Sequence, residues 1–249
     1  MGIISPFLLS LIIIIVGSSY YWLSTNKQTE LTTYITADTT NQSLITETKE
    51  KNFSDFLRQK KQLSLKNEMT ARRTKQANLN NNDLPEIYAL ANGRLTITEN
   101  TQIIWQSSND WWVDNFILAD ANNDGIIDIN LSVWKSGNFG PSQPFWVKND
   151  DLSVKNHFFI FDLIAEKVEP LWQSSNLTVP NCEFAVTDID KDGQNDLIVI
   201  EGNYTQTPEC HGDYIALWKW NDWGFSNEWR STKGNFSHLD IEKIKEKNN

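Results

Sequence analysis

The sequence predicts an all-β fold, a small array of about three four-stranded antiparallel sheets that follows an N-terminal transmembrane helix and a helical stalk. Three observations support this prediction: an apolar N-terminal run without charge, a polar and then basic segment, and a repeated pattern of short apolar runs and Asp-Gly turns. They divide the chain into an anchor (residues 1–23), a linker with a stalk (24–83) and a β-repeat domain (84–249).

The anchor is predicted from the apolar run Ile3–Val16, since no charged side chain precedes Lys27. Continued to Leu23, this segment has about the 20 residues needed to cross a bilayer, and the aromatic residues 20–22 resemble an interfacial belt. A cleaved signal peptide is the alternative, because residues 17–19 (Gly-Ser-Ser) offer a cleavage site, although the usual basic segment is absent. Either segment would export the rest of the chain, so we expect an extracytoplasmic domain, membrane-anchored or, after cleavage, secreted.

The linker and stalk differ in composition. Residues 24–50 are rich in Ser, Thr, Asn and Gln, which is typical of a solvated linker. From Asn52 to about Asn78 helix formers, basic residues and a rough apolar stripe predict a solvated helical stalk. A basic surface that contacts anionic polymer or lipid headgroups is the alternative.

The charge of the β-repeat domain restricts its partners. Up to Asp83 the chain has 10 Lys/Arg against 7 Asp/Glu, and from Leu84 onward it has 12 against 25. An acidic domain repels phosphate and attracts cations, so we expect no nucleic-acid partner.

An internal repeat organises the domain. The segment Trp-Gln-Ser-Ser occurs at Trp105 and again at Trp172, and a third, incomplete copy begins at Trp229. After each of the first two copies an apolar run ends in an Asp that opens an Asp-Gly loop. The first complete unit predicts strands at 115–120, 128–135, 157–163 and 167–173, the second predicts strands at 183–188, 196–201, 214–220 and 224–230, and strands near 87–90, 95–98, 102–106 and 236–242 are left over.

The leftover strands predict how the array ends. We expect 236–242 to join the strands of 87–106 in one sheet, because this pairing removes two exposed edges. The residues Trp105, Trp172 and Trp229 should then be equivalent, each on the final strand of its sheet.

Two acidic loops carry the chemistry, at residues 120–128 and 188–196, with the pattern Asp-x-Asp/Asn-x-Asp-Gly-x-x-Asp. Ca²⁺ takes about six to eight hard oxygen ligands, which a tight loop supplies from alternate residues. The Gly at position 6 permits the turn, and the carbonyl of position 7 and the carboxylate of position 9 can complete the shell. An EF-hand is excluded, because position 12 is Leu131 or Val199 and not Glu, and because both flanks are β-rich.

These loops and the strands around them resemble the FG-GAP/VCBS repeats of integrin α-chain-type β-propellers, over roughly residues 85–242. The resemblance implies about two bound Ca²⁺ per chain. The implied ligands are Asp120, Asn122, Asp124, Asp128 and the Ile126 carbonyl at the first site, and Asp188, Asp190, Asp192, Asp196 and the Gln194 carbonyl at the second. Because Asn122 replaces an acid, we expect weaker binding at the first site.

Two alternatives stay open for this resemblance. The Asp-Gly turns can join hairpins without any metal. Propellers also have about four to eight blades, whereas this chain supplies about three sheets, so a three-sheet ring, an open stack and closure by oligomerisation are all compatible with the sequence.

The two cysteines, Cys182 and Cys210, flank one repeat, and in an exported domain they predict a disulfide. Two buried thiols are the alternative, and a zinc site with His211 lacks two further ligands.

The sequence leaves two other classes of function to consider, a lectin and an enzyme. Exposed tryptophans stack on sugars, so a lectin-like surface is an alternative; the tryptophans concerned are Trp111, Trp112, Trp134, Trp146, Trp218, Trp220 and Trp223. We expect no enzyme, because Gly-x-Ser-x-Gly and His-Glu-x-x-His are absent and the three His are scattered, which leaves a hydrolase as the least favoured function. The sequence therefore predicts a membrane-anchored extracytoplasmic calcium-binding module for adhesion or assembly with a surface protein or polysaccharide.

Overall fold

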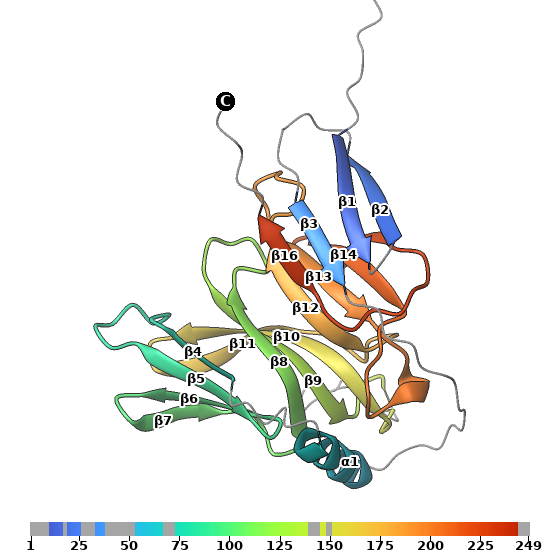
Figure 1. Cartoon of the computed structure of the whole chain (residues 1–249). Coiled ribbons are helices and arrows are strands. Elements are labelled where there is room, and N and C mark those ends of the chain that lie inside the picture. Colours follow the sequence, from blue (N-terminus) through green and yellow to red (C-terminus); the bar gives the residue numbers. More distant parts are fainter. Residues whose placement is uncertain are drawn as a thin grey trace, which may run out of the picture.

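The computed structural model describes residues 10–16, 19–25, 33–37, 53–66, 73–138, 145–147 and 151–243. These residues form one α-helix, one short 3-10 helix, η1 (Tyr204–Gln206), and sixteen strands, so the chain is mostly β, as predicted. Figure 1 shows the strands grouped into separate sheets, with α1 (Phe53–Lys66) at the foot of the molecule.

Three of the sheets are antiparallel and four-stranded, and in each the strands lie side by side in chain order. The first sheet contains β4 (Arg73–Ala77), β5 (Glu86–Ala91), β6 (Arg94–Glu99) and β7 (Gln102–Gln106). The second contains β8 (Trp111–Ala119), β9 (Asp128–Ser136), β10 (Val154–Ile164) and β11 (Lys167–Gln173). The third contains β12 (Asn181–Thr187), β13 (Asp196–Glu201), β14 (Tyr214–Trp220) and β15 (Phe225–Arg230).

The repeated Trp-x-Ser segment has the same role in all three sheets. The three tryptophans lie on the fourth strands, opposite a third-strand residue at which the register shifts: Trp105 opposite Ile97, Trp172 opposite Ile160 and Trp229 opposite Leu217. Two residues later the serine hydroxyl accepts a hydrogen bond from the third strand: Ser107 from the Leu95 amide (3.1 Å), Ser174 from Phe158 (3.0 Å) and Ser231 from Ile215 (3.0 Å). The predicted place of the three tryptophans, on the final strand of each sheet, is confirmed.

The predicted pairing of the two ends of the domain is wrong. The position expected for 236–242 in the first sheet is held by β4, which pairs with β5. The strand β16 (Asp240–Lys243) instead pairs with β3 (Thr33–Ala37), in a fourth sheet that also contains β1 (Ser10–Val16) and β2 (Ser19–Thr25). Because β4 already covers the edge of β5, no vacant edge is left there for the C-terminal strand.

The strand β4 also changes the predicted boundary at which the β domain begins. We expected residues 24–83 to form a linker and a stalk, with the β domain beginning at Leu84. Arg73–Ala77 lies within that range and is the first strand of the first sheet, so the β domain begins about one strand earlier than predicted.

The three sheets pack on one another in chain order. One apolar core joins the first and second sheets, with Tyr88 and Leu95 on one side and Phe159 and Phe161 on the other. A second core joins the second and third sheets and includes Phe158 and Ile160. Alternate residues of β10 therefore point into different cores, which explains its uninterrupted apolar run. The middle sheet is covered on both faces (Figure 1).

The outer face of the third sheet is covered by the segment that comes after β15. Phe236, which is 1% exposed, pairs with Gly212 in an isolated bridge and packs with Leu239 against Ile198 and Ile200. This segment thus contributes to the core, although in a place different from the one we predicted.

The helix α1 lies within the basic segment, and one side of it is packed against the second sheet. Phe56 is 1% exposed and packs on Trp134, with 5.1 Å between the ring centroids. Lys60 Nζ lies 2.9 Å from Asp114, whose carboxylate also accepts hydrogen bonds from Trp112 and Trp134. The buried Phe56 ring and the half-buried ion pair between Lys60 and Asp114 together hold α1 against the second sheet.

The predicted anchor, residues 1–23, lies partly outside the described residues. Ser10–Val16 and Ser19–Thr25 are strands here, and we find no helix in the described part of the chain that is long and apolar enough to cross a membrane. The anchor, helical or cleaved, stays a prediction.

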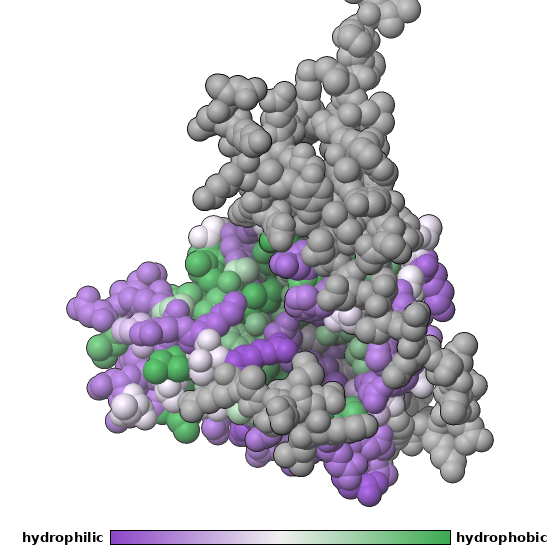
Figure 2. Space-filling view, in the orientation of Figure 1, coloured by the Kyte–Doolittle hydropathy of each residue, from purple (hydrophilic) through white to green (hydrophobic). Residues whose placement is uncertain are grey.

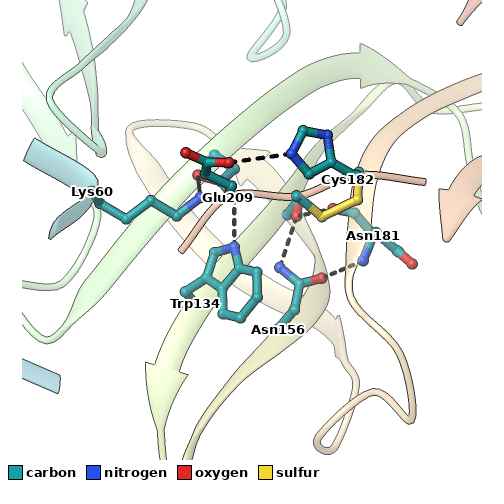
Figure 3. The surroundings of a disulfide bond; sticks show 10 residues. Lys60, Trp134, Asn156, Asn181, Cys182 and Glu209 are labelled. Carbon is teal, nitrogen blue, oxygen red and sulfur yellow. Dashed lines mark hydrogen bonds and ion pairs between the residues drawn. A yellow bond between two sulfur atoms is a disulfide. The ribbon is translucent and has the colours of Figure 1, made fainter. Parts of the chain in front are cut away.

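The predicted disulfide is confirmed. Cys182 and Cys210 are bridged, with 5.2 Å between their Cα atoms. Figure 3 shows the bridge close to Asn181, whose backbone amide donates to the Asn156 side chain at 3.0 Å. The bond ties the first strand of the third sheet to the segment before β14.

Candidate metal centre

The two acidic loops occupy equivalent places, between the first and second strands of the second and third sheets. Residues 120–128 join β8 to β9, and residues 188–196 join β12 to β13. The loops also contact each other: the Asn195 amide donates to Asn123 Oδ1 at 2.6 Å, and Asn123 Nδ2 donates to the Asn195 carbonyl at 3.1 Å. The predicted sites are therefore neighbours at one end of adjacent sheets.

Each loop is folded by its own acidic side chains. Position 1 accepts a hydrogen bond from the Gly at position 6, at 2.9 Å for Asp120 and 3.0 Å for Asp188. Position 5 accepts from the amide of position 7, at 2.8 Å in the first loop and 2.9 Å in the second. The two glycines have φ of 88° and 90°, which side-chain-bearing residues resist. Local sequence thus sets a loop that directs its acids inward.

The second loop brings three of its predicted ligands together. Asp188, Asp190 and Asp196 each offer an oxygen within 4.8 Å of the others, an acidic triad that could hold a metal ion. In the first loop Asn122 Nδ2 donates to Asp124 at 2.9 Å, and within the described ranges Asp120, Asp124 and Asp128 form no comparably tight group. The carbonyls of Ile126 and Gln194, at position 7 of each loop, stay predicted ligands.

The ninth residue of each loop, Asp128 or Asp196, is fully buried, with 0% exposure. Both carboxylate oxygens of Asp128, and Oδ1 of Asp196, lack a hydrogen-bond partner among the residues described. Burial, reinforced by the nearby Asp162 carboxyl, raises the pKa of Asp128 to about 9. Burial also raises the pKa of Asp196 to about 6, although the Ile189 amide and the Lys219 ammonium oppose it. A divalent cation would supply the positive charge that the first site lacks, whereas at the second site the Lys219 ammonium lies 3.6 Å from Asp196 Oδ1.

Residues on the third strand, which sequence reasoning missed, complete both loops. Phe161 of β10 pairs with Ile129, which brings Asp162 beside Asp128. Lys219 of β14 pairs directly with Asp196. Pairing the predicted strands in register would have revealed both residues, because each lies on a strand that the repeat predicts.

A third loop of the same kind, also missed, joins β4 to β5. It reads Asn-Leu-Asn-Asn-Asn-Asp-Leu-Pro-Glu over residues 78–86. The amide of its position 7, Leu84, donates to Asn82 Oδ1 at 2.7 Å, which matches the other loops. The amide of its position 2, Leu79, donates to Glu86 at 2.9 Å, as Ile189 does to Asp196 at 3.1 Å. The first repeat thus retains the loop backbone with amides in place of acids.

The charges of this third loop are few and partly paired. Glu86, at position 9, is 0% exposed, and its Oε1 has no hydrogen-bond partner within the described residues. Across β5 and β6 lies Glu99, whose Oε1 accepts from the side chains of Asn80 at 2.8 Å and Asn82 at 2.7 Å. Two amides therefore hold Glu99 in the place taken by Asp162 or Lys219 in the other sheets.

Most tryptophans of the predicted sugar-binding surface are part of the cores. Trp112 and Trp134 are 6% and 0% exposed, and Trp111 packs on Phe159. Trp218 and Trp220 pack partly buried against the core between the second and third sheets. Trp146 and Trp223 stay open to solvent, at 70% and 80% exposure.

Comparison with known proteins adds no relative. A scan against protein-family models, a search of curated proteins and a search of solved structures each found no match to this chain.

Proposed function

We propose that this protein is a calcium-binding β-repeat module of the FG-GAP/VCBS type, anchored in a membrane on its extracytoplasmic side and used for adhesion or assembly. The observation that carries the proposal is the pair of buried carboxyl groups Asp128 and Asp196, at equivalent positions of two loops, with oxygens that accept no hydrogen bond among the residues described. A plain hairpin turn does not need a buried carboxyl group, and burying one whose oxygens accept no hydrogen bond is costly.

Calcium fits these loops better than other ligands. The groups that converge are carboxylate oxygens, which are the hard ligands that Ca²⁺ prefers. Soft thiolate ligands are excluded, because both cysteines of the chain are joined in the disulfide. The disulfide also favours an oxidising, extracytoplasmic compartment, where free calcium is plentiful.

Adhesion or assembly requires a surface that a protein or polysaccharide can contact. Figure 2 shows apolar residues exposed among polar ones on one face of the described chain. Ile103, Ile164 and Trp223 are 59%, 61% and 80% exposed. These side chains support contact with a surface partner, and the two exposed tryptophans keep a glycan as one class of ligand.

The metal is tested by calorimetric titration of the full chain in detergent, with thermal melts in calcium and in EDTA. We expect about 10⁻⁴–10⁻³ M affinity, as in other extracellular modules. Calcium at about ten times Kd should stabilise the fold by about 1.4 kcal/mol per site. Asp188→Asn should weaken binding, whereas Asp110→Asn, an exposed acid outside the loops, should not. No calcium heat together with equal melting temperatures would reject the proposal.

The partner is tested by capture from native membranes, with and without chelator, and by a glycan array. A protein recovered only with calcium supports assembly, and a calcium-dependent glycan signal supports the lectin alternative. Equal recovery of a partner with and without chelator would show that partner binding does not depend on calcium in the loops.

A further inference from the structure

The side chain of Lys219 occupies the acidic loop of the third sheet. Its ammonium nitrogen lies 2.8 Å from Asp190, 2.6 Å from Asp192 and 3.6 Å from Asp196. All three carboxylates are predicted calcium ligands, and two of them belong to the triad that could hold a metal ion. A cation from the chain itself therefore contacts the oxygens that calcium would use.

This contact is built into the sheet. Lys219 is paired with Asp196 in the ladder between β13 and β14, so its Cα is fixed beside the buried end of the loop. The side chain is 23% exposed, and its two short contacts are charge-assisted hydrogen bonds, which are stronger than neutral ones. A solvent-exposed lysine with a flexible side chain would show neither this fixed position nor two short hydrogen bonds.

The corresponding place in the second sheet holds the opposite charge. There Asp162 lies beside Asp128, so the first loop has Asp120, Asp124, Asp128 and Asp162 and no ammonium among the contacts described. The second loop has four acids but also two lysines, Lys191 at its position 4 and Lys219 on β14. With every carboxyl ionised its formal charge is thus −2 against −4 for the first loop with Asp162, although residues 120–128 and 188–196 alone both sum to −3.

We propose that Lys219 is a tethered cation that closes the second loop when calcium is absent and that calcium must expel in order to bind there. An ammonium and a Ca²⁺ ion cannot share the same carboxylates, because the two positive charges would repel at contact distance. The first loop, which Asp162 completes, is consequently the tighter site, and the second fills only at higher calcium. This inference rests on the proposed calcium function.

The decisive variant is Lys219→Met, which keeps a chain of similar length and removes the charge. Its matched control is Lys233→Met, because Lys233 is 65% exposed, pairs with Asp213 at 3.4 Å and carries the same charge away from the loops. Both changes are also made with Asp124→Asn, which weakens the first loop through an exposed residue and leaves the second loop to be measured.

In calorimetric titrations of the full chain with Ca²⁺, Lys219→Met should tighten the weaker site by about tenfold or more, since two charge-assisted hydrogen bonds no longer compete. The tighter site and the Lys233→Met control should be unchanged. Two calcium sites that Lys219→Met leaves unaltered would overturn this inference and leave the proposed function intact. No calcium binding by the wild type or by any variant would instead overturn the proposed function.

A measurement on the unaltered chain covers the case in which Lys219→Met does not fold. The NMR signal of the Lys219 Cε methylene group, assigned by its loss in a Lys219→Arg variant, should shift during the second calcium step and not during the first. A signal that stays fixed through saturation of both sites would show that the lysine is not expelled. In EDTA, Lys219→Met should also melt below the wild type, and calcium should remove that difference.

Discussion

The change Asp128→Asn separates a metal site from a structural turn, because the two predict opposite signs. Asp128 is 0% exposed, neither of its oxygens has a hydrogen-bond partner within the described ranges, and the group beside it is another carboxyl, Asp162. Because burial and Asp162 raise the pKa of Asp128 to about 9, Asp128 carries a proton near neutral pH when no metal is bound. Asparagine has nearly the same shape and needs no proton. The substitution therefore removes both the cost of protonating Asp128 on folding and a proposed calcium ligand.

The size of each effect follows from the pKa of Asp128 and from the calcium affinity. Without metal the wild type must protonate Asp128 on folding, which costs about 1.4 kcal/mol for each pH unit above the unfolded-state pKa. The variant has no such cost, so it should be the more stable protein in EDTA near neutral pH. With calcium at about ten times Kd, the wild type gains about 1.4 kcal/mol at this site, and the variant loses that gain. The advantage of the variant should therefore shrink or reverse in calcium.

Urea denaturation of both proteins, in EDTA and in calcium, measures the two effects as shifts of the midpoint at constant slope. Asp110→Asn serves as the control for loss of one negative charge at an exposed position. If Asp128→Asn shifts the midpoint equally in both conditions, calcium does not use this carboxylate, and the reasoning from its unpartnered oxygens fails.

Three further predictions concern the scaffold. Replacing Cys182 and Cys210 with serine should lower the free energy of unfolding by about 3–4 kcal/mol, because the bridge closes a loop with a sequence separation of 28; an unchanged urea midpoint would contradict this. Phe56→Ala should cost about 3 kcal/mol and render α1 cleavable by protease, and a resistant helix would argue against its docking. Burial, opposed by Arg230, raises the pKa of Glu201 above 4.5, so its stabilising contribution is full below the unfolded-state pKa and is lost as pH rises through the folded-state pKa. Glu201→Gln should flatten the curve of stability against pH over that range, whereas parallel curves for variant and wild type would refute the assignment.

The sequence predicted those features that short local patterns encode. The repeat, most strands and the two Asp-Gly loops depend on residues close together in the chain. Arg73–Ala77 was missed because this edge strand is polar and four of its five residues are exposed, which leaves no apolar alternation to detect. The erroneous closure by residues 236–242 was a direct result, since the position of β4 was taken to be vacant.

The missed site residues required information across strands. Asp162 and Lys219 join the loops only through the register of β9 with β10 and of β13 with β14. The loop that ends at Glu86 escaped detection because its Asn residues and its Asp at position 6 do not match the acidic pattern, although its backbone hydrogen bonds do. A search for polar side chains at alternate loop positions, rather than for acids alone, would have found it.

The packing order of the sheets has a consequence for how the protein opens. The first and third sheets each share one intersheet core with the second, whereas the second is held from both sides through β10. In such nearest-neighbour arrays, partial unfolding begins at an end and leaves the interior unit for last. Amide exchange should therefore be slowest in β9 and β10. The second acidic loop belongs to the third sheet, which is an end sheet. Calcium bound there would therefore stabilise this sheet against local unfolding and leave the stability of the other sheets unchanged.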